Sequence, residues 1–194
     1  MMKWRDIAAI ARRLLPYSPG RYLKRLEAGH QAGVDLYSDG KYVESERRFA
    51  NNVELARSFG EESSELIDYL KKLGDFYHST GNYSSAEQPL LEAMTITQER
   101  FGMEDYQVAP VLNDIALLYY AQGRYQEAET SFKRLRKIFE EHAAASAEMA
   151  ICLENYAAVL RRLDRDEEST QLRARAKKIR DADQSSSIGA PSLP

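Results

Sequence analysis

A Gly-x-Tyr tripeptide recurs at a nearly constant interval in this sequence of 194 residues, beginning at Gly40, Gly81 and Gly123. The intervals are 41 and 42 residues, and each copy has a small residue seven positions before the glycine and a large apolar residue nine positions after it. A weaker fourth copy keeps the same register around Asp164. Repeats of this length constrain the fold strongly, because one unit cannot bury its own apolar face and must stack on its neighbours.

Each repeat divides into two amphipathic helices. Apolar residues from Leu112 to Tyr119 follow the i, i+3, i+4, i+7 spacing of one helix face, and those from Tyr125 to Leu135 do the same after Gly123. Glycine suits the end of the first helix because it enters the left-handed conformation without strain. The sequence therefore predicts an all-α fold of helix–turn–helix units at about residues 26–61, 62–103, 104–144 and 145–182.

The stretch from Leu112 to Glu129 resembles the repeat core of the tetratricopeptide repeat family, in its longer 42-residue, kinesin-light-chain-like form. The resemblance covers about residues 26–182 and is specific because the motif recurs in register. It implies a right-handed α-solenoid of about four repeats with an N-terminal capping helix. The departures are Ser45 and Asn52, where small apolar residues are usual, and a polar last repeat, which a solubilising cap requires.

The two termini differ from the repeats in composition. Residues 1–25 carry seven Lys or Arg and one acid, a net of +6 in a chain whose net charge is −3. Apolar residues from Trp4 to Leu15 have helical spacing, and Pro16 ends the pattern. We interpret this segment as an amphipathic helix and linker that cap the open end of the first repeat, the alternative being a helix that lies on anionic lipid. Residues 183–194 are rich in Ser, Gly and Pro and predict a disordered tail.

No constellation of residues points to catalysis, a cofactor or a metal. The single cysteine, Cys152, excludes a disulfide framework and multi-cysteine zinc sites, and its place on an apolar helix face predicts a buried, inert thiol. The three histidines lie at least 48 residues apart and lack ligand partners at helical spacing. The near balance of 27 basic and 30 acidic residues argues against a nucleic-acid binder.

The resemblance implies that the first helix of each repeat lines a concave groove in which a ligand binds. Read in register, the residues on the outward side of these helices are the candidate ligand contacts. They are His30, Gln31 and Tyr37 in the first repeat, Lys71, Lys72, Asp75 and His78 in the second, Asn113, Asp114, Leu117 and Tyr120 in the third, and Glu154, Asn155, Arg161 and Arg162 in the fourth.

Three groups within this set carry the functional hypothesis. Leu117 and Tyr120 lie about one helical turn apart and offer apolar surface to an extended or helical peptide. Asn113 and Asn155 match family positions whose amides hold the backbone of a bound peptide. The four Lys and Arg side chains of the set flank these positions and indicate an acidic residue in the partner.

We therefore expect a non-catalytic scaffold that binds a peptide segment of a partner protein, without a cofactor and without nucleic acid, in the cytoplasm of a bacterium. Two alternatives stay open. One is a membrane-peripheral adaptor that docks through residues 1–25, and the other is a regulatory subunit of an enzyme. The open ends of the array are also compatible with self-association.

Overall fold

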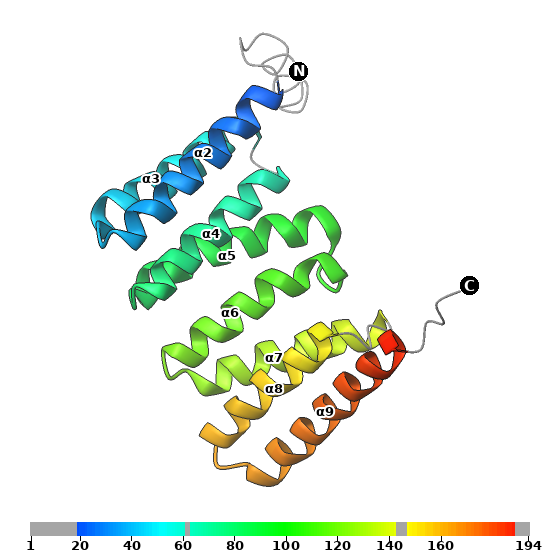
Figure 1. Ribbon diagram of the computed structural model, residues 1–194. Helices are drawn as coiled ribbons and strands as arrows, with labels where there is room; N and C mark the ends of the chain where they lie inside the picture. Colours follow the sequence, from blue (N-terminus) through cyan, green and yellow to red (C-terminus); the bar gives the residue numbers. More distant parts are fainter. Residues whose placement is uncertain (1–18, 61–62, 143–146, 189–194) are drawn as a thin grey trace, which may run out of the picture. The chain divides into compact units, whose positions relative to one another are not determined.

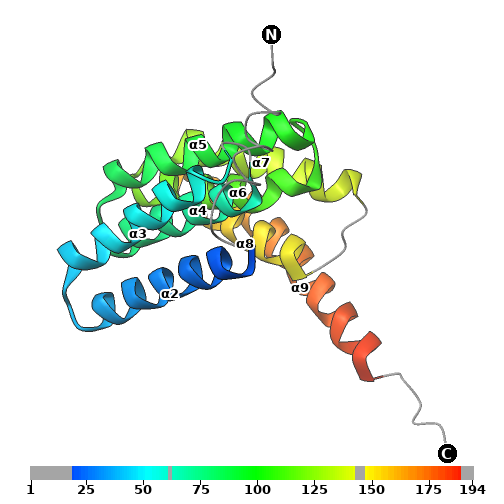
Figure 2. The same ribbon diagram turned by 90° about the horizontal axis from the view of Figure 1, so that it is seen from above.

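The computed structural model describes residues 19–60, 63–142 and 147–188, and every regular element within these ranges is a helix (Figure 1). The chain divides into two compact units, residues 1–100 and 101–194. Each unit consists of antiparallel helix pairs, and α2 and α3 lie side by side in both views (Figure 2). The expected all-α organisation is confirmed. Unit 1 contains α2 (Pro19–Ser38), α3 (Tyr42–Arg57), α4 (Ser64–Ser79) and nearly all of α5 (Tyr83–Phe101), and unit 2 contains the 3₁₀ helix η1 (Tyr106–Val108), α6 (Ala109–Ala121), α7 (Tyr125–Glu141), α8 (Ala147–Arg162) and α9 (Asp166–Ile188).

The turns that join the paired helices have one geometry in all four repeats. Gly40, Gly81 and Gly123 each have a φ of 75°, in the left-handed region that glycine enters at low cost. Asp164 occupies the fourth turn with a φ of 59°, which aspartate tolerates better than most residues. The amide after each of the four residues closes the same backbone hydrogen bond to a carbonyl five positions earlier. The weak fourth copy is therefore a full structural repeat.

The two helices of a pair approach most closely at the small residue of the first helix. A Cβ atom on Gly74 would lie 2.6 Å from Cγ of Leu90, and one on Gly33 would lie 3.1 Å from the Phe49 ring. In the third repeat the equivalent residue is Ala116, whose exposed fraction is 0%. These positions leave no room for a larger side chain, which accounts for the small residue in each repeat.

The departures from the usual repeat pattern at Ser45 and Ser169 have a direct structural reason. The buried Ser45 hydroxyl donates to the carbonyl of Gly33 at 2.7 Å, and the buried Ser169 hydroxyl donates to the carbonyl of Ala157 at 2.7 Å. Each hydroxyl is thus satisfied by the small residue of the facing helix, so that serine replaces alanine without leaving a buried donor unpaired.

Within each unit, polar contacts tie the second helix of one repeat to the first helix of the next. In unit 1 the Tyr77 hydroxyl donates to the Glu46 carboxylate at 2.8 Å, which together with burial raises the pKa of Tyr77 to about 12. In unit 2 the carboxylate of Glu129 accepts hydrogen bonds from Tyr156 and from Arg165. These contacts join α3 to α4 and α7 to α8 and α9.

The ends of the array differ from the expected boundaries. The first helix begins at Pro19 rather than near residue 26. The last helix continues to Ile188, although a disordered tail is expected from residue 183. Polar residues alone do not end a helix, and the first glycine after α9 is Gly189. The expected capping helix lies outside the described residues.

Replacing Gly74 by alanine tests the close approach of α4 and α5. The new Cβ atom would overlap Leu90, so we expect Gly74→Ala to lower the free energy of unfolding by about 1–2 kcal/mol despite the better helix propensity of alanine. The same change in a Leu90→Ala background should be neutral or stabilising. Gly20→Ala is the control, because a Cβ atom there meets nothing within 4 Å. Urea denaturation of the four variants measures these differences, and an equal loss in both backgrounds would contradict the packing argument.

The raised pKa of Tyr77 predicts loss of stability in alkali. Its folded pKa of about 12 lies above the ordinary tyrosine value of 10.0, so its contribution to stability is complete below pH 10 and is lost as the pH rises from 10 to 12. Tyr77→Phe should therefore be less stable than the wild type at pH 7 and should lose less stability between pH 10 and 12. Denaturation midpoints across this range measure both effects. An unchanged slope would show that the Tyr77 hydroxyl is not bound to Glu46 in the folded chain.

Candidate functional site

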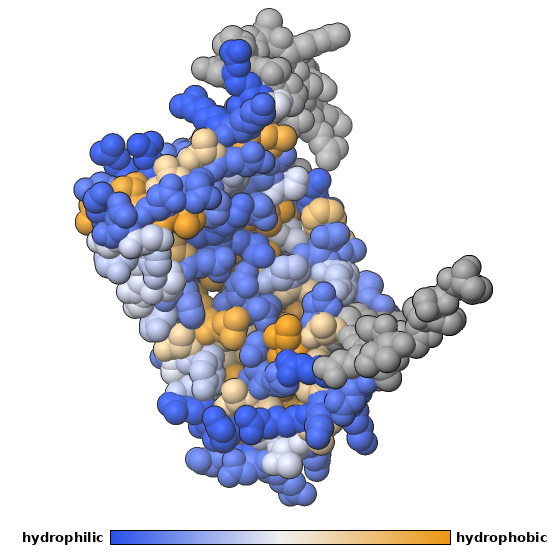
Figure 3. Space-filling model, viewed as in Figure 1, coloured by the Kyte–Doolittle hydropathy of each residue, from blue (hydrophilic) through white to orange (hydrophobic). Residues whose placement is uncertain are grey.

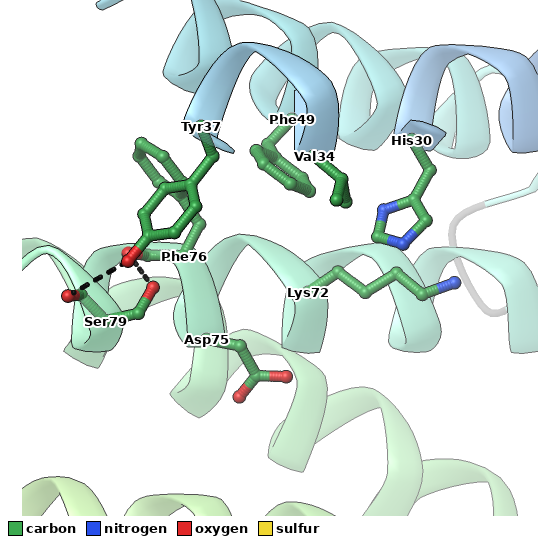
Figure 4. Close-up of a pocket in the computed structure, with 8 residues that line it drawn as sticks. All are labelled: His30, Val34, Tyr37, Phe49, Lys72, Asp75, Phe76 and Ser79. Atoms are coloured by element: carbon green, nitrogen blue, oxygen red, sulfur yellow. Dashed lines mark hydrogen bonds between the residues drawn. The ribbon is translucent and has the colours of Figure 1, made fainter. Parts of the chain in front are cut away.

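A cavity of about 290 Å³ lies within unit 1, between the first two repeats (Figure 4). Helix α2 supplies His30, Val34 and Tyr37, α3 supplies Phe49, and α4 supplies Lys72, Asp75, Phe76 and Ser79. Apolar and polar side chains are present on both the α2–α3 side and the α4 side of the cavity (Figure 4). The structure thus brings together four of the residues expected from the sequence, His30, Tyr37, Lys72 and Asp75.

His30 is the most unusual polar group of this cavity. Its ring makes edge contacts with Phe49 and Tyr69, at centroid distances of 5.6 and 6.3 Å. Its Nδ1 atom is buried and makes no hydrogen bond among the described residues. Burial lowers the pKa of His30, and the nearby charge of Lys72 lowers it further against the opposing effect of Asp68. The imidazole is therefore neutral near pH 7 and presents an unsatisfied ring nitrogen.

The charge of Lys72 is partly compensated inside the protein. Its ammonium group lies 3.3 Å from the Asp68 carboxylate and 4.4 Å from the centroid of the Tyr69 ring. An exposed i,i+4 ion pair of this kind contributes little to stability. Lys72 can therefore exchange Asp68 for a carboxylate of a ligand at small cost.

Three expected residues of unit 1 do not line the cavity. Gln31 is exposed and donates to the carboxylate of Asp35 at 2.8 Å. His78 is also exposed and packs against Tyr83. Lys71 is partly buried and lies outside the lining.

The contact between His78 and Tyr83 belongs to a recurring aromatic pair at the repeat turns. The ring five residues before each Gly-x-Tyr tyrosine packs against it at centroid distances of 5.3–5.6 Å, in the pairs Tyr37–Tyr42, His78–Tyr83 and Tyr120–Tyr125. The first member of each pair is one of the ligand contacts expected from the sequence. The structure shows that these rings also stabilise the turns, a role that the repeat spacing could have indicated.

In unit 2 the two expected asparagines occupy equivalent positions on neighbouring first helices. Asn113 lies on α6 and Asn155 on α8, and residues of these two helices are in contact. Both side chains are partly buried. Within the part of the chain that the structure describes, neither amide makes a hydrogen bond.

The other expected residues of unit 2 fall into two groups. Glu154 and Arg162 are held by internal contacts, because Glu154 pairs with Arg180 of α9 at 2.6 Å and Arg162 donates to the Tyr125 hydroxyl at 2.6 and 2.9 Å. The remaining residues sit at the surface. Leu117 and Asp114 are partly buried and Arg161 is exposed.

Sequence reasoning missed the aromatic wall of the cavity. Phe49 and Phe76 are 6% and 5% exposed, so their hydropathy marks them as core. They are core residues whose ring faces also border the cavity (Figure 4). Their position in the sequence could have indicated this role, because Phe76 immediately follows Asp75 and lies between first-helix residues of the expected groove.

The described residues contain no cluster of three or more His, Cys, Asp or Glu that could hold a metal ion. Cys152 is 1% exposed, and burial raises the pKa of its thiol to about 12. The expectation of a buried thiol is confirmed. Among the described helices, none combines the length and apolar character needed to cross a membrane.

Comparison with known proteins gives a family match and structural neighbours. The model of the tetratricopeptide repeat matches residues 26–99 and 103–182. The crystal structure of BtubC (BKLC) from P. vanneervenii is similar with a TM-score of 0.74 and 19% identity, covering 98% of this chain and 74% of that one. A putative kinesin light chain from Podosopora anserina with nearly identical TPR-like repeats gives a TM-score of 0.70 and 17% identity over 93% and 85% of the two chains. At these identities the likeness is one of fold, and no curated protein matches the chain at a significant level.

The burial of Cys152 predicts that its thiol does not react in the folded protein. With a pKa of about 12, almost none of the thiol is ionised at pH 8, and the thiolate is the reactive form. We expect labelling by a disulfide reagent such as DTNB to be at least about 100-fold slower in native buffer than in guanidinium chloride. Absorbance at the reagent's product band measures both rates. Fast labelling without denaturant would contradict the burial of this helix face.

Proposed function

The chain belongs to the tetratricopeptide repeat family, and we propose that it is a non-catalytic scaffold that binds an extended segment of a partner protein along the first helices of its repeats. Repeats of this family generally mediate protein–protein interaction. The family therefore supplies the class of function, and the geometry of the first helices supports the mode of binding.

The observation that carries the proposal is the pair of amides at Asn113 and Asn155, which are partly exposed and make no hydrogen bond within the described residues. A primary amide offers both donors and an acceptor, which matches the N–H and C=O groups of a peptide backbone. Because no internal hydrogen bond has to be broken, a peptide can bind both amides by displacing water alone. Leu117 lies four residues after Asn113 on the same helix and can cover apolar atoms of the ligand.

The cavity of unit 1 supports the same function by a different contact. Its Val34, Phe49 and Phe76 wall favours an apolar side chain of the bound segment. The neutral ring of His30 and the weakly paired Lys72 provide polar contacts at its opening. A carboxylate in the partner would replace Asp68 at Lys72, and a second one would pair with the exposed Arg161.

The role of the two asparagines in binding can be tested with peptides selected from a random library. Random twelve-residue peptides displayed on phage are selected on the full chain, and the enriched peptides are measured against Asn113→Ala/Asn155→Ala. Each lost hydrogen bond costs about 0.5–1.5 kcal/mol, so we expect the dissociation constant to rise by about 5- to 150-fold. Tyr120 is left unchanged because its contact with Tyr125 belongs to the turn.

A matched control removes two amides elsewhere in unit 2. Gln126 on α7 and Gln171 on α9 are exposed, and Gln126→Ala/Gln171→Ala should bind the peptides as the wild type does. Circular dichroism checks that both double variants keep their helix content. If the selected peptides bind all three proteins equally, the asparagines do not hold a ligand and the proposed binding mode is wrong.

A further inference from the structure

A second hollow lies on the first helix pair, on the opposite side of α2 from the cavity described above. Its volume is about 490 Å³, and it is lined only by α2 and α3, through Arg25, Ala28, Gly29, Ala32, Arg48, Asn51, Asn52 and Leu55. Ala28 and Ala32 precede His30 and Val34 by two residues each. Two residues correspond to about 200° around a helix, so that the two hollows open on nearly opposite faces of α2.

Small side chains on α2 and a polar one on α3 create this hollow. Ala28, Gly29 and Ala32 form one wall, and Asn52 stands against them because a Cβ atom on Gly29 would lie 2.2 Å from Asn52 Oδ1. The Asn52 amide nitrogen donates to the carbonyl of Leu26 at 2.9 Å. In the later repeats this register position holds apolar residues that are buried, such as Ala93. At this position the first repeat therefore has a buried polar side chain, whereas the later repeats have apolar core residues.

The hollow is flanked by positive charge that has no counter-ion among the described residues. Arg25 and Arg48 line it from the two helices, and neither makes an ion pair or a hydrogen bond within the described residues. Arg21, Lys24 and Arg47 on the same helices are exposed and equally unpaired there. By contrast, Arg57 of α3 pairs with Glu92 at 2.6 Å. Hydrophilic side chains predominate on the visible surface over α2 and α3, with apolar side chains between them (Figure 3).

We propose that this hollow binds an acidic segment of a partner protein, with carboxylates paired to Arg25 and Arg48. The guanidinium group binds a carboxylate through two parallel hydrogen bonds, and two of them on facing helices favour two carboxylates on one chain. The exposed Asn51 amide can hold the backbone between them. This surface is separate from the groove of the proposed function and does not depend on it.

Charge and shape favour this occupant over two others. Residues 1–18 carry four Lys or Arg and one acid, so placing them against Arg25 and Arg48 brings like charges together. A lipid surface can meet exposed arginines but cannot enter a hollow between two helices. An acidic peptide satisfies both the charge and the shape.

The test uses the full chain and a defined probe. A fluorescein-labelled peptide of eight residues with alternating Glu and Ser is titrated with the protein at about 50 mM salt, and anisotropy gives the dissociation constant. The Gln–Ser peptide of the same length is the uncharged control. We expect Arg25→Gln/Arg48→Gln to weaken binding of the acidic peptide by at least about tenfold.

A charge-matched variant separates a specific site from a general effect of charge. Arg173 and Lys177 on α9 are exposed and have no ion-pair partner among the described residues, so Arg173→Gln/Lys177→Gln lowers the net charge equally and should change binding less than about twofold. Ala28→Leu fills the hollow without changing any charge and should also weaken binding. Equal losses in the two charge variants, or unchanged binding in Ala28→Leu, would overturn the proposal.

Two further results would also overturn it and would name the occupant. If the acidic peptide does not bind while vesicles of phosphatidylserine and phosphatidylcholine bind in a manner that requires Arg25 and Arg48, the surface is a lipid contact. Trp4 is the single tryptophan of the chain. If the peptide does not bind and Ala28→Leu shifts the fluorescence of Trp4, residues 1–18 occupy the hollow.

Discussion

The close approach of two helices at one small residue is the constraint on which each repeat depends. At Gly74 the neighbouring Leu90 side chain occupies the space where a Cβ atom would stand, so the helices pack backbone against side chain over that turn. The left-handed residue that follows seven positions later reverses the chain within a few residues and places the second helix in this contact. The position of the turn and the position of the helix contact therefore depend on each other. A change in spacing between them would rotate the second helix and move its apolar stripe off the first.

Much of this fold could be predicted from the sequence because its determinants are local and repeated. The same period relates the glycine, the small residue and the apolar stripe of successive repeats. A substitution at one position therefore leaves the register recognisable. The fourth repeat keeps the same turn although its sequence matches the pattern less well. Asp164 retains the left-handed turn without glycine, because aspartate tolerates that conformation. The fourth repeat therefore keeps the turn geometry even though aspartate replaces the turn glycine.

The candidate site was less predictable because its side chains have two uses. Tyr37 and His78 are predicted to contact a ligand, and in the structure each packs on the tyrosine of its own turn. Phe49 and Phe76 are buried enough to read as core and still border the cavity. Glu154 is held by Arg180, which lies 26 residues later and on a different helix. Helical register shows which way a residue points, whereas its partner depends on tertiary packing that no single position encodes.

The distribution of unpaired groups separates structural polarity from polarity that is available to a ligand. Glu129 is mostly buried, and although burial alone raises its pKa, hydrogen bonds from Lys133 and Arg165 bring the pKa below the ordinary value of a glutamate. The Glu129 carboxylate therefore has a structural role in the packing of the helices. The serines that replace alanine in the first and last repeats are likewise satisfied by the facing helix. Against this background of matched donors and acceptors, the amides of Asn113 and Asn155 and the arginines of the first helix pair stand out within the described residues. Together with the buried Nδ1 atom of His30, these groups are the ones from which the proposed ligand contacts are drawn.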